Sequence, residues 1–258
     1  MFEACGCNLV RSSGAQGAVE VAATTLPSLQ RFMRLHTARG ASHTAPAAGA
    51  AHLREQERHE QTMFFIVTFV LPGPPEMSFI MVFKRSVPRG VDRAFDVLWA
   101  RFLDGDDEFK NSRFKFACRL LSAPWLVKTA MATLGGVRPS ILGRKLRTEY
   151  THAPGSGGGG GLEGAAGRGA DPLAPRYLEA SVYVNSSVVA RKIFSLVSGG
   201  APQIAMEFAF FIEGVEEAEL PERLIGCFRL CHASVAGMAA PYPATQGPAT
   251  QEPAAAQC

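Results

Sequence analysis

Two apolar runs separated by a short turn constrain the fold of this chain more than any other feature. FFIVTFVL at residues 64–71 is rich in β-branched and aromatic side chains, and MSFIMVFK at residues 77–84 has the same character. The intervening PGPPE consists largely of residues that favour turns. The sequence therefore predicts an antiparallel hairpin. Its longest apolar run, residues 63–71, is far shorter than the ~20 residues that a membrane-spanning helix needs.

Residues 204–212 alternate as a half-buried strand does. One face carries only bulky apolar side chains, which are Ile204, Met206, Phe208, Phe210 and Ile212. LIGCFRLCH, residues 224–232, is predicted to be the hairpin partner of this strand. The bulky face would either line a cavity for an apolar ligand or fill the core, and the sequence leaves both readings open. If the opposite face lined the cavity, enlarging Ala205 or Ala209 would displace the ligand.

A third hairpin is predicted from residues 141–152 and 177–184. Alternate apolar side chains face inward in both segments, whereas Glu149 and Glu179 face outward. Residues 153–175 between them form a low-complexity, Gly-rich insertion that cannot bury enough apolar area to order itself. We therefore expect the tip of this hairpin to be disordered.

Three segments have the periodicity or the caps of helices. Residues 91–103 repeat apolar side chains at helical spacing, Pro124 opens a short helix over residues 125–134, and Ser187 caps a helix that the glycines at 199–200 end. Three hairpins and three helices favour an α+β fold, with a curved antiparallel β-sheet built from hairpins and a few packed helices. A helix-grip-like sheet is one form that such a fold takes.

Length and composition favour one globular domain with loosely structured ends. The hydrophobic content of 47% over 258 residues is ample for one buried core. We expect residues 62–233 to form that domain. Residues 1–61 are expected to be a weakly structured extension with at most a short helix at 26–36, and residues 234–258 a disordered tail.

The N-terminus and the cysteines favour a cytoplasmic protein. MFEACGCNLV, residues 1–10, contains an acid and no apolar h-region, so it does not indicate a secretory signal. Arg31, Arg34 and Arg39 follow an Ala-, Ser- and Thr-rich opening, which leaves an organellar address open. The six cysteines show no paired framework and therefore indicate a reducing compartment.

The sequence shows no recognisable catalytic or metal-binding constellation. The acids of FLDGDDEFKNSRFKF, residues 102–116, lack the central Gly and the final Glu of a calcium loop. Cys5-x-Cys7 and Cys227-x3-Cys231 lack the second pair of ligands that zinc requires, and GSGGGGG lacks the Lys-Ser/Thr ending of a phosphate loop. Cys231 and His232 are neighbours, but they would point to opposite faces of a strand. We therefore predict no metal, no cofactor and no enzymatic activity.

The basic and aromatic residues suggest two candidate lipid contacts. A net charge of +3 and a pI near 8.6 are too mild to indicate nucleic-acid binding. Trp125 begins a short cationic segment that would suit a membrane interface, but the tight bounds of this segment favour a helix packed on the sheet with Trp125 buried. Six basic residues would form either a patch for anionic headgroups or a solvated sheet face: Arg113, Lys115, Lys145, Arg147, Arg191 and Lys192.

Five ordered blocks of the sequence resemble one known family. They are DGDDEFKNSRFKF, SAPWLVKTAMATLGG, SILGRKLRTEY, YLEASVYVNSSVVARKIFSLV and FFIEGVEEAELPERLIGCFRL, and they are similar to the Enhanced Disease Resistance 2 C-terminal domain of plants and their relatives. The resemblance covers about residues 63–233 apart from the Gly-rich insertion, with no visible family segment upstream of the first hairpin. We interpret its densest motif as a fold signature, made of Asp104, Gly105, Asp106, Asp107, Phe109, Asn111, Ser112, Arg113, Phe114 and Lys115.

The resemblance implies a domain without established catalytic activity, which often follows a pleckstrin-homology module and a START lipid-binding module in larger proteins. It offers no active-site residues to transfer to this numbering. We therefore expect a non-enzymatic, lipid-associated or lipid-binding regulatory domain at a cytosolic membrane surface, whose partner is an anionic lipid or an apolar small molecule. A protein-interaction scaffold is the alternative, and a hydrolase is a third. We expect neither a nucleic-acid partner nor a transmembrane segment.

Overall fold

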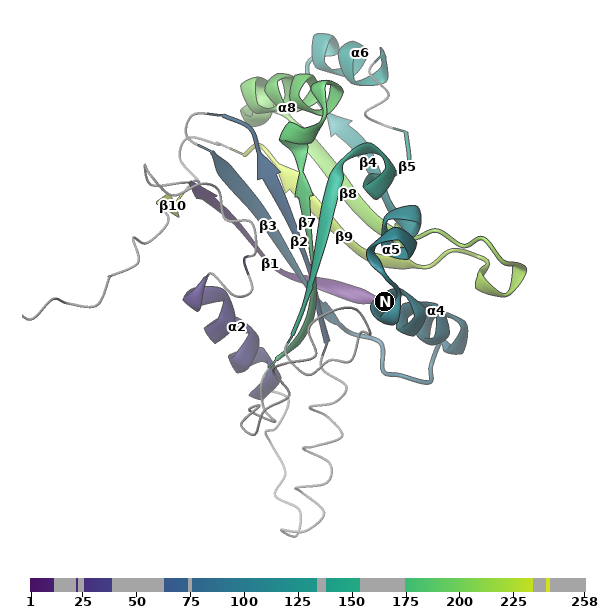
Figure 1. Ribbon diagram of the computed structural model, residues 1–258. Helices are drawn as coiled ribbons and strands as arrows, with labels where there is room; N and C mark the ends of the chain where they lie inside the picture. Colours follow the sequence, from purple (N-terminus) through teal and green to yellow (C-terminus); the bar gives the residue numbers. More distant parts are fainter. Residues whose placement is uncertain are drawn as a thin grey trace, which may run out of the picture.

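The computed structural model of the chain describes residues 1–11, 22, 26–38, 63–73, 76–133, 138–153, 175–233 and 240–241. Two β-sheets face each other, with helices α6 and α8 at one end of the molecule and α4 and α5 towards the other (Figure 1). This arrangement confirms the predicted α+β class. The strands divide between two sheets, and most of their pairings are antiparallel.

The six-stranded sheet has the order β10-β1-β3-β2-β7-β6. Its strands are β1 (Phe2–Arg11), β2 (Met63–Leu71), β3 (Met77–Arg85), β6 (Arg147–His152), β7 (Arg176–Tyr183) and β10 (Ala240–Pro241). Strands β2 and β3 pair antiparallel from Phe64 opposite Lys84 to Leu71 opposite Met77, which confirms the first predicted hairpin. Strands β6 and β7 form a second hairpin, and β7 joins β2 in parallel. This parallel pairing is a contact between distant segments that local alternation does not predict.

The four-stranded sheet has the order β5-β4-β8-β9. Its strands are β4 (Phe114–Ser122), β5 (Ser140–Ile141), β8 (Ala205–Ile212) and β9 (Leu224–Cys231). Strands β8 and β9 pair antiparallel and confirm the hairpin predicted from residues 204–232. The continuous strand predicted over residues 141–152 is wrong, because the one-turn helix α7 (Leu142–Lys145) separates β5 from β6.

The expectation of a weakly structured N-terminus is wrong for β1, which pairs antiparallel with β3 along its length. The sequence hides this strand because its side chains do not alternate between buried and exposed positions. Helix α2 (Pro27–Ala38) confirms the helix considered at residues 26–36. The expectation of a disordered tail is wrong for the two residues of strand β10, which pairs in parallel with β1. Residues 12–21, 23–25, 39–62, 154–174, 234–239 and 242–258 lie outside the described residues, so what we expect of them stays a prediction.

Both faces of the six-stranded sheet are covered near its centre. All nine residues of β2 are buried: one face meets the second sheet and the other packs with α2. Glu179 on β7, expected to face outward, is therefore fully buried. Its carboxylate accepts hydrogen bonds from Thr68 Oγ1 at 2.5 Å and from the Ala22 N–H at 2.8 Å, which compensate for its burial.

Side chains cap the N-termini of several helices. Besides α2, the longer ones are α4 (Arg93–Asp104), α5 (Asp107–Arg113), α6 (Trp125–Thr133) and α8 (Val188–Gly200). Asp92 caps α4 by accepting a hydrogen bond from the Phe95 N–H at 3.0 Å. Ser187 caps α8 as predicted, since its hydroxyl accepts from the Ala190 N–H at 3.4 Å.

One end of the space between the sheets is filled by aromatic rings, and we call it the closed end. Phe65 of β2, Phe114 of β4 and Phe210 of β8 are fully buried, with the Phe114 and Phe210 rings stacked at a centroid distance of 5.9 Å. Helix α4 closes this end with Phe95, Trp99 and Phe102, which are also buried. These rings belong to the core that lies between the two sheets.

Candidate functional site

The other end of the same space contains a cavity of about 610 Å³, and we call it the open end. Strands from both sheets form its walls through Phe69, Phe79, Phe116 and Phe208. Strand β8 thus serves both purposes that its sequence left open, because Phe210 fills the core whereas Met206 and Phe208 line the cavity. Ala205 and Ala209 point to the other face, so enlarging them would not fill this cavity.

Helix α8 covers the cavity without closing it. Its apolar face, with Ile193, Phe194 and Val197, lines the space, yet no residue of the helix is fully buried. An apolar helix face in a folded protein normally packs against side chains of comparable size. Here part of that face borders open volume. The arrangement suits an apolar ligand that would complete the packing.

The cavity has basic groups at its edge and no acidic ones among its described lining residues. Arg138 and Lys145 are the charged members of that lining, and both are exposed. Within the described residues, neither side chain forms an ion pair. The site therefore combines an apolar interior with a positively charged rim.

Helix α6 lies next to α8 and presents apolar side chains to solvent. Trp125 is 77% exposed and Leu126 is 60% exposed, so the preferred prediction of a buried Trp125 is wrong. The inward face of α6 instead carries Val127 and Met131, which pack with residues of α8 and β8. In a nine-residue helix that is apolar on most sides, sequence alone does not decide which face turns inward.

The structure does not bring the six candidate basic residues into one patch. Arg113 is buried, and its Nη1 lies 2.6 Å from Glu219 Oε2. Lys115 Nζ lies 2.6 Å from Glu213 Oε2 and 2.8 Å from Glu222 Oε2. These two residues are therefore already neutralised and are not available to a headgroup.

The other four candidates lie nearer the open end. Arg147 forms an ion pair with Glu149 at 2.7 Å and lies over the ring of Tyr183 at 3.9 Å. Lys145 belongs to the cavity rim. Arg191 and Lys192 are exposed on α8, and neither forms an ion pair within the described residues. Three of the six predicted basic residues thus remain available at this end of the molecule.

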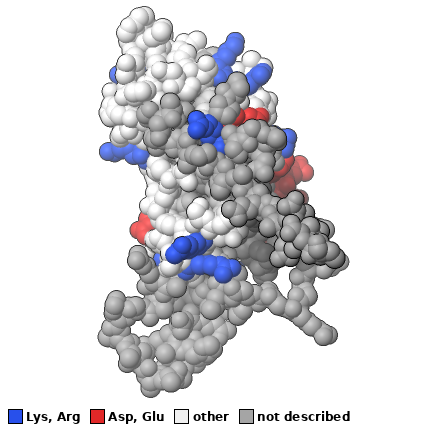
Figure 2. Space-filling view, turned by 90° about the vertical axis from the view of Figure 1, so that its left-hand side faces the viewer, with Lys and Arg blue, Asp and Glu red and all other residues white. Residues whose placement is uncertain are grey.

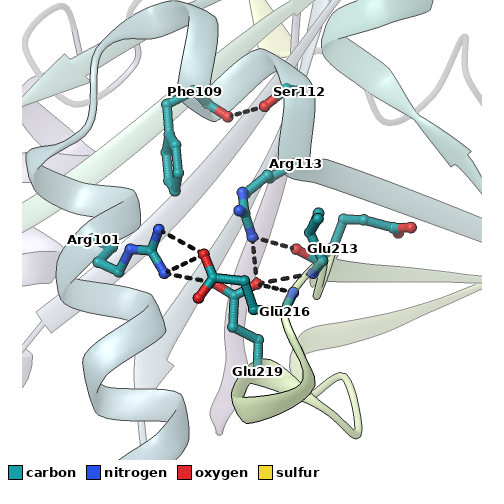
Figure 3. Close-up of polar contacts among 8 residues, drawn as sticks. Arg101, Phe109, Ser112, Arg113, Glu213, Glu216 and Glu219 are labelled. Atoms are coloured by element: carbon teal, nitrogen blue, oxygen red, sulfur yellow. Dashed lines mark hydrogen bonds and ion pairs between the residues drawn. The ribbon is translucent and has the colours of Figure 1, made fainter.

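The fold signature builds a polar network at the closed end (Figure 3). Glu219 accepts from Arg101 at 2.7 Å and from Arg113 at 2.6 Å, and Arg101 also reaches Glu216. Burial alone would raise the pKa of the Glu219 carboxyl, but hydrogen bonds from the Val215 N–H and from Arg113 hold that pKa below its usual value. The network joins α4 and α5 to the turn between β8 and β9.

The remaining signature residues organise the junction of α4, α5 and α7. Asp104 ends α4, and Asp106 caps α5 by accepting from the Phe109 N–H at 2.7 Å. Ser112 donates to the Phe109 carbonyl at 2.7 Å. Asn111 accepts a hydrogen bond from the Tyr150 hydroxyl at 3.2 Å. Asp107 lies in the first turn of α5, where a carboxylate interacts favourably with the helix dipole.

Two glycines allow close approaches at this junction. A Cβ on Gly105 would lie 2.6 Å from a ring atom of Phe109, and a Cβ on Gly143 would clash with Cα of Asn111. Gly143 belongs to α7, so its close contact with Asn111 of α5 fixes the short helix that carries Lys145. The signature thereby also helps to position the cavity rim.

Sequence reasoning missed Arg138 and the cavity face of α8. One signal was present in the distribution of charge: residues 109–148 and 180–206 contain no Asp or Glu at all. These two segments supply most of the cavity rim and its helical cover. A long acid-free stretch with several bases indicates a positively charged surface once the fold brings the two segments together.

Other kinds of site find no support in the described part of the chain. No group of three or more His, Cys, Asp or Glu side chains lies close enough there to hold a metal ion. None of its helices combines the length and the apolar character that crossing a bilayer requires.

Comparison with known proteins identifies relatives. The family described as "Protein ENHANCED DISEASE RESISTANCE 2, C-terminal" matches residues 14–234. This match begins well upstream of the first hairpin, so the apparent absence of an upstream family segment is wrong. A protein described as "Protein ENHANCED DISEASE RESISTANCE 2-like" from Arabidopsis thaliana is 30% identical over 178 residues, which cover 68% of this chain and 20% of that protein. The chain thus matches only a fifth of the length of this relative. No solved structure matches the chain.

Proposed function

This chain belongs to the ENHANCED DISEASE RESISTANCE 2 C-terminal family, and from that premise we propose that it is a non-enzymatic domain that binds a lipid at the cytosolic surface of a membrane. The observation that carries the proposal is the cavity of about 610 Å³ between the two sheets. Its size falls within the range of ~300–1,000 Å³ that small-molecule sites occupy.

The energetics of the cavity favour an acyl chain. Each methylene group moved from water into an apolar space contributes ~0.8 kcal/mol, so ten methylenes contribute ~8 kcal/mol. Association costs at least ~4 kcal/mol of lost translational and rotational freedom. A chain of that length therefore suffices for binding if the cavity walls are already in place. The walls of this cavity are two sheets that pack against each other through the aromatic core of the closed end.

The chemistry of the lining supports a binding role rather than catalysis. Its described residues include no histidine or carboxylate that would serve as a general base. Burial raises the pKa of the Cys118 thiol to about 11, which disfavours the nucleophilic thiolate. The Ser187 hydroxyl, another lining group, accepts the capping hydrogen bond of α8.

The membrane part of the proposal is supported by the surface around α6 and α8. Trp125 and Leu126 of α6 are exposed, and so are the basic residues Lys128 on α6 and Arg191 and Lys192 on the neighbouring α8. The upper part of the face in Figure 2 is mostly uncharged, with several Lys and Arg side chains and few Asp or Glu side chains. An exposed Trp among basic side chains suits the interface of an anionic membrane, and each cation near such a surface contributes ~1 kcal/mol. Anionic lipids are enriched in the cytoplasmic leaflet.

Ligand binding is tested with an uncharged fluorescent probe, N-phenyl-1-naphthylamine, added to purified and delipidated chain. We expect saturable binding of one probe per chain that high salt does not weaken, because apolar burial is insensitive to screening. Native mass spectrometry before delipidation checks for a retained apolar molecule. The absence of both probe binding and a retained molecule would contradict lipid binding.

Membrane association is tested by sedimentation with vesicles. We expect the chain to sediment with anionic vesicles more than with neutral ones, and added salt should weaken this binding. The double variant Arg191→Glu/Lys192→Glu should lose it. The control Arg89→Glu/Arg93→Glu changes the net charge equally, but at exposed positions around the start of α4. Equal losses in both variants would show that net charge alone drives sedimentation.

A protein-interaction scaffold is the second candidate, because exposed Trp125 and Leu126 would also suit a protein groove. It predicts that neither the probe nor the vesicles bind the chain. It also predicts that any partner is lost when Trp125 is replaced.

A further inference from the structure

We infer that the cavity binds an amphiphile with a single acyl chain and an anionic head, and that Arg138 and Lys145 at the rim hold this head. The inference rests on the proposed lipid-binding function and specifies its ligand class. It follows from three observations, which are the volume of the cavity, the charge of its lining and the anchoring of the two basic residues.

The volume suits a ligand with one chain. A water molecule occupies about 30 Å³ of liquid, and a methylene group is of similar size, so about 610 Å³ holds about twenty such groups. One long acyl chain with a small head meets this limit. A lipid with two long chains exceeds it about twofold, and its second chain would have to lie outside. The open end is therefore matched to a single-chain molecule.

The charge of the lining selects an anionic head. Arg138 and Lys145 have no ion-pair partner within the described residues, and no described lining residue is acidic. Arg119 and Arg229, two other bases in this half of the molecule, both pair with Glu207, at 2.6 and 2.5 Å. Two unpaired cations next to an apolar space are suited to a carboxylate or a phosphate at the end of an apolar chain.

Arg138 and Lys145 lie next to backbone segments that are held by strand pairing and by close helix contacts. Arg138 lies two residues before β5, which pairs with β4 through Ser140 opposite Phe116. Lys145 is the last residue of α7, whose single turn is closed by the Leu146 N–H and the Leu142 carbonyl at 2.8 Å. Close contact of Gly143 with Asn111 fixes this turn against α5. The rim is thus held by the same motif that stabilises the closed end.

The test compares ligands that differ only in the head. Oleic acid, oleoyl lysophosphatidic acid and oleyl alcohol are titrated to displace N-phenyl-1-naphthylamine from the full chain at pH 8. We expect the two acids to bind about tenfold more tightly than the alcohol, because charge-assisted hydrogen bonds at an exposed rim contribute about this much. The stronger of the two acids identifies the head as a carboxylate or a phosphate. Dioleoyl phosphatidic acid, with two chains, should compete poorly.

Variants locate the effect at the rim. Arg138→Gln/Lys145→Gln should remove the tenfold preference for the acids and leave the affinity for oleyl alcohol unchanged. The control Arg147→Gln removes a nearby cation that pairs with Glu149 and does not line the cavity, and it should keep the preference. Unfolding curves of the variants check that the fold survives.

The outcomes separate this inference from the proposed function. Equal affinity for acids and alcohol in the native chain would overturn the inference, while the proposed lipid binding would stand. A preference that survives in Arg138→Gln/Lys145→Gln would also overturn it, because another group would then hold the head. Tighter binding of the two-chain lipid would reject the single-chain class. If no chain displaces the probe and the probe itself does not bind, the proposed function fails as well.

Discussion

The closed and open ends of this molecule lie between the same two sheets but are covered by different helices. Both ends carry phenylalanines on neighbouring strands, with Phe210 at one and Phe208 two residues away at the other. At the closed end, α4 contributes Phe95, Trp99 and Phe102, and the space is full. At the open end, α8 contributes mostly aliphatic side chains, and about 610 Å³ stays open. The size of the side chains on the covering helix therefore decides whether a cavity forms.

The two ends also differ in how their charges are used. At the closed end, Arg113 and Lys115 are neutralised by glutamates on the turn between β8 and β9. At the open end, Arg138 and Lys145 have no partner in the described chain. Neutralised charges stabilise a junction, whereas unpaired charges remain available to a ligand. The comparison thus assigns stability to one end and binding to the other.

The largest expected effect comes from removing a ring at the closed end. Phe210→Ala should lower the free energy of unfolding by ~4 kcal/mol, because a fully buried ring leaves a cavity among packed neighbours. Phe208→Ala should cost about half as much, since Phe208 already borders open space, and it should admit a bulkier chain. Urea unfolding followed by circular dichroism measures both. A larger loss for Phe208→Ala would contradict the division into two ends.

The next effect concerns the network of Figure 3. Glu219→Gln should lower the free energy of unfolding by ~3 kcal/mol, because it leaves Arg113 buried without its counter-charge. The control Glu207→Gln removes an acid whose partners Arg119 and Arg229 are exposed, and its loss should be smaller. Chemical unfolding at neutral pH compares them, and equal losses would refute a special role for the buried network.

The same carboxyl predicts a pH dependence. The pKa of Glu219 is lower in the folded chain than its ordinary value of 4.5, so its stabilising effect is fully present above pH 4.5 and is lost as the pH falls through the folded pKa. In Glu219→Gln, the fall in stability below pH 4.5 should therefore be shallower than in the native chain. Unfolding midpoints measured from pH 3 to pH 7 test this, and parallel curves would show that Glu219 does not contribute.

The smallest expected effect on stability lies on α6. Trp125→Ala should change the free energy of unfolding by no more than ~0.5 kcal/mol, because the ring is 77% exposed. Binding to anionic vesicles should nevertheless weaken about tenfold, which is the effect of one lost aromatic anchor. Val215→Ala, which removes an exposed apolar side chain from the acidic turn, should change neither property. Unchanged vesicle binding in Trp125→Ala would exclude α6 from the membrane contact.

Local chemistry was enough to predict the hairpins at 63–84 and 204–232 and the cap at Ser187, because turn residues, alternation and caps act over a few residues. It could not predict β1, since its pairing with β3 joins residues that lie 66 to 83 positions apart. The same limit applies to charge. Arg113 and Lys145 look alike in sequence, but a glutamate 106 residues further along the chain neutralises only Arg113.

The orientation of Trp125 and the presence of a cavity could not be predicted for a different reason. Both depend on the volume left after all elements have packed, and a strand such as β8 has the same alternating pattern whether its neighbours fill the space or not. The covering helix α8 shows an apolar face in either case. Only the assembled structure shows that part of this face borders empty volume.

The central claim is that the space beneath α8 binds the ligand, and filling that space tests it most directly. Ala190 lines the cavity, whereas Val188 on the same helix is 58% exposed and lies outside the lining. Ala190→Trp should abolish binding of N-phenyl-1-naphthylamine, because the indole would occupy the ligand volume, and Val188→Trp should leave the affinity unchanged. Equal binding by both variants, with the fold intact, would contradict the account.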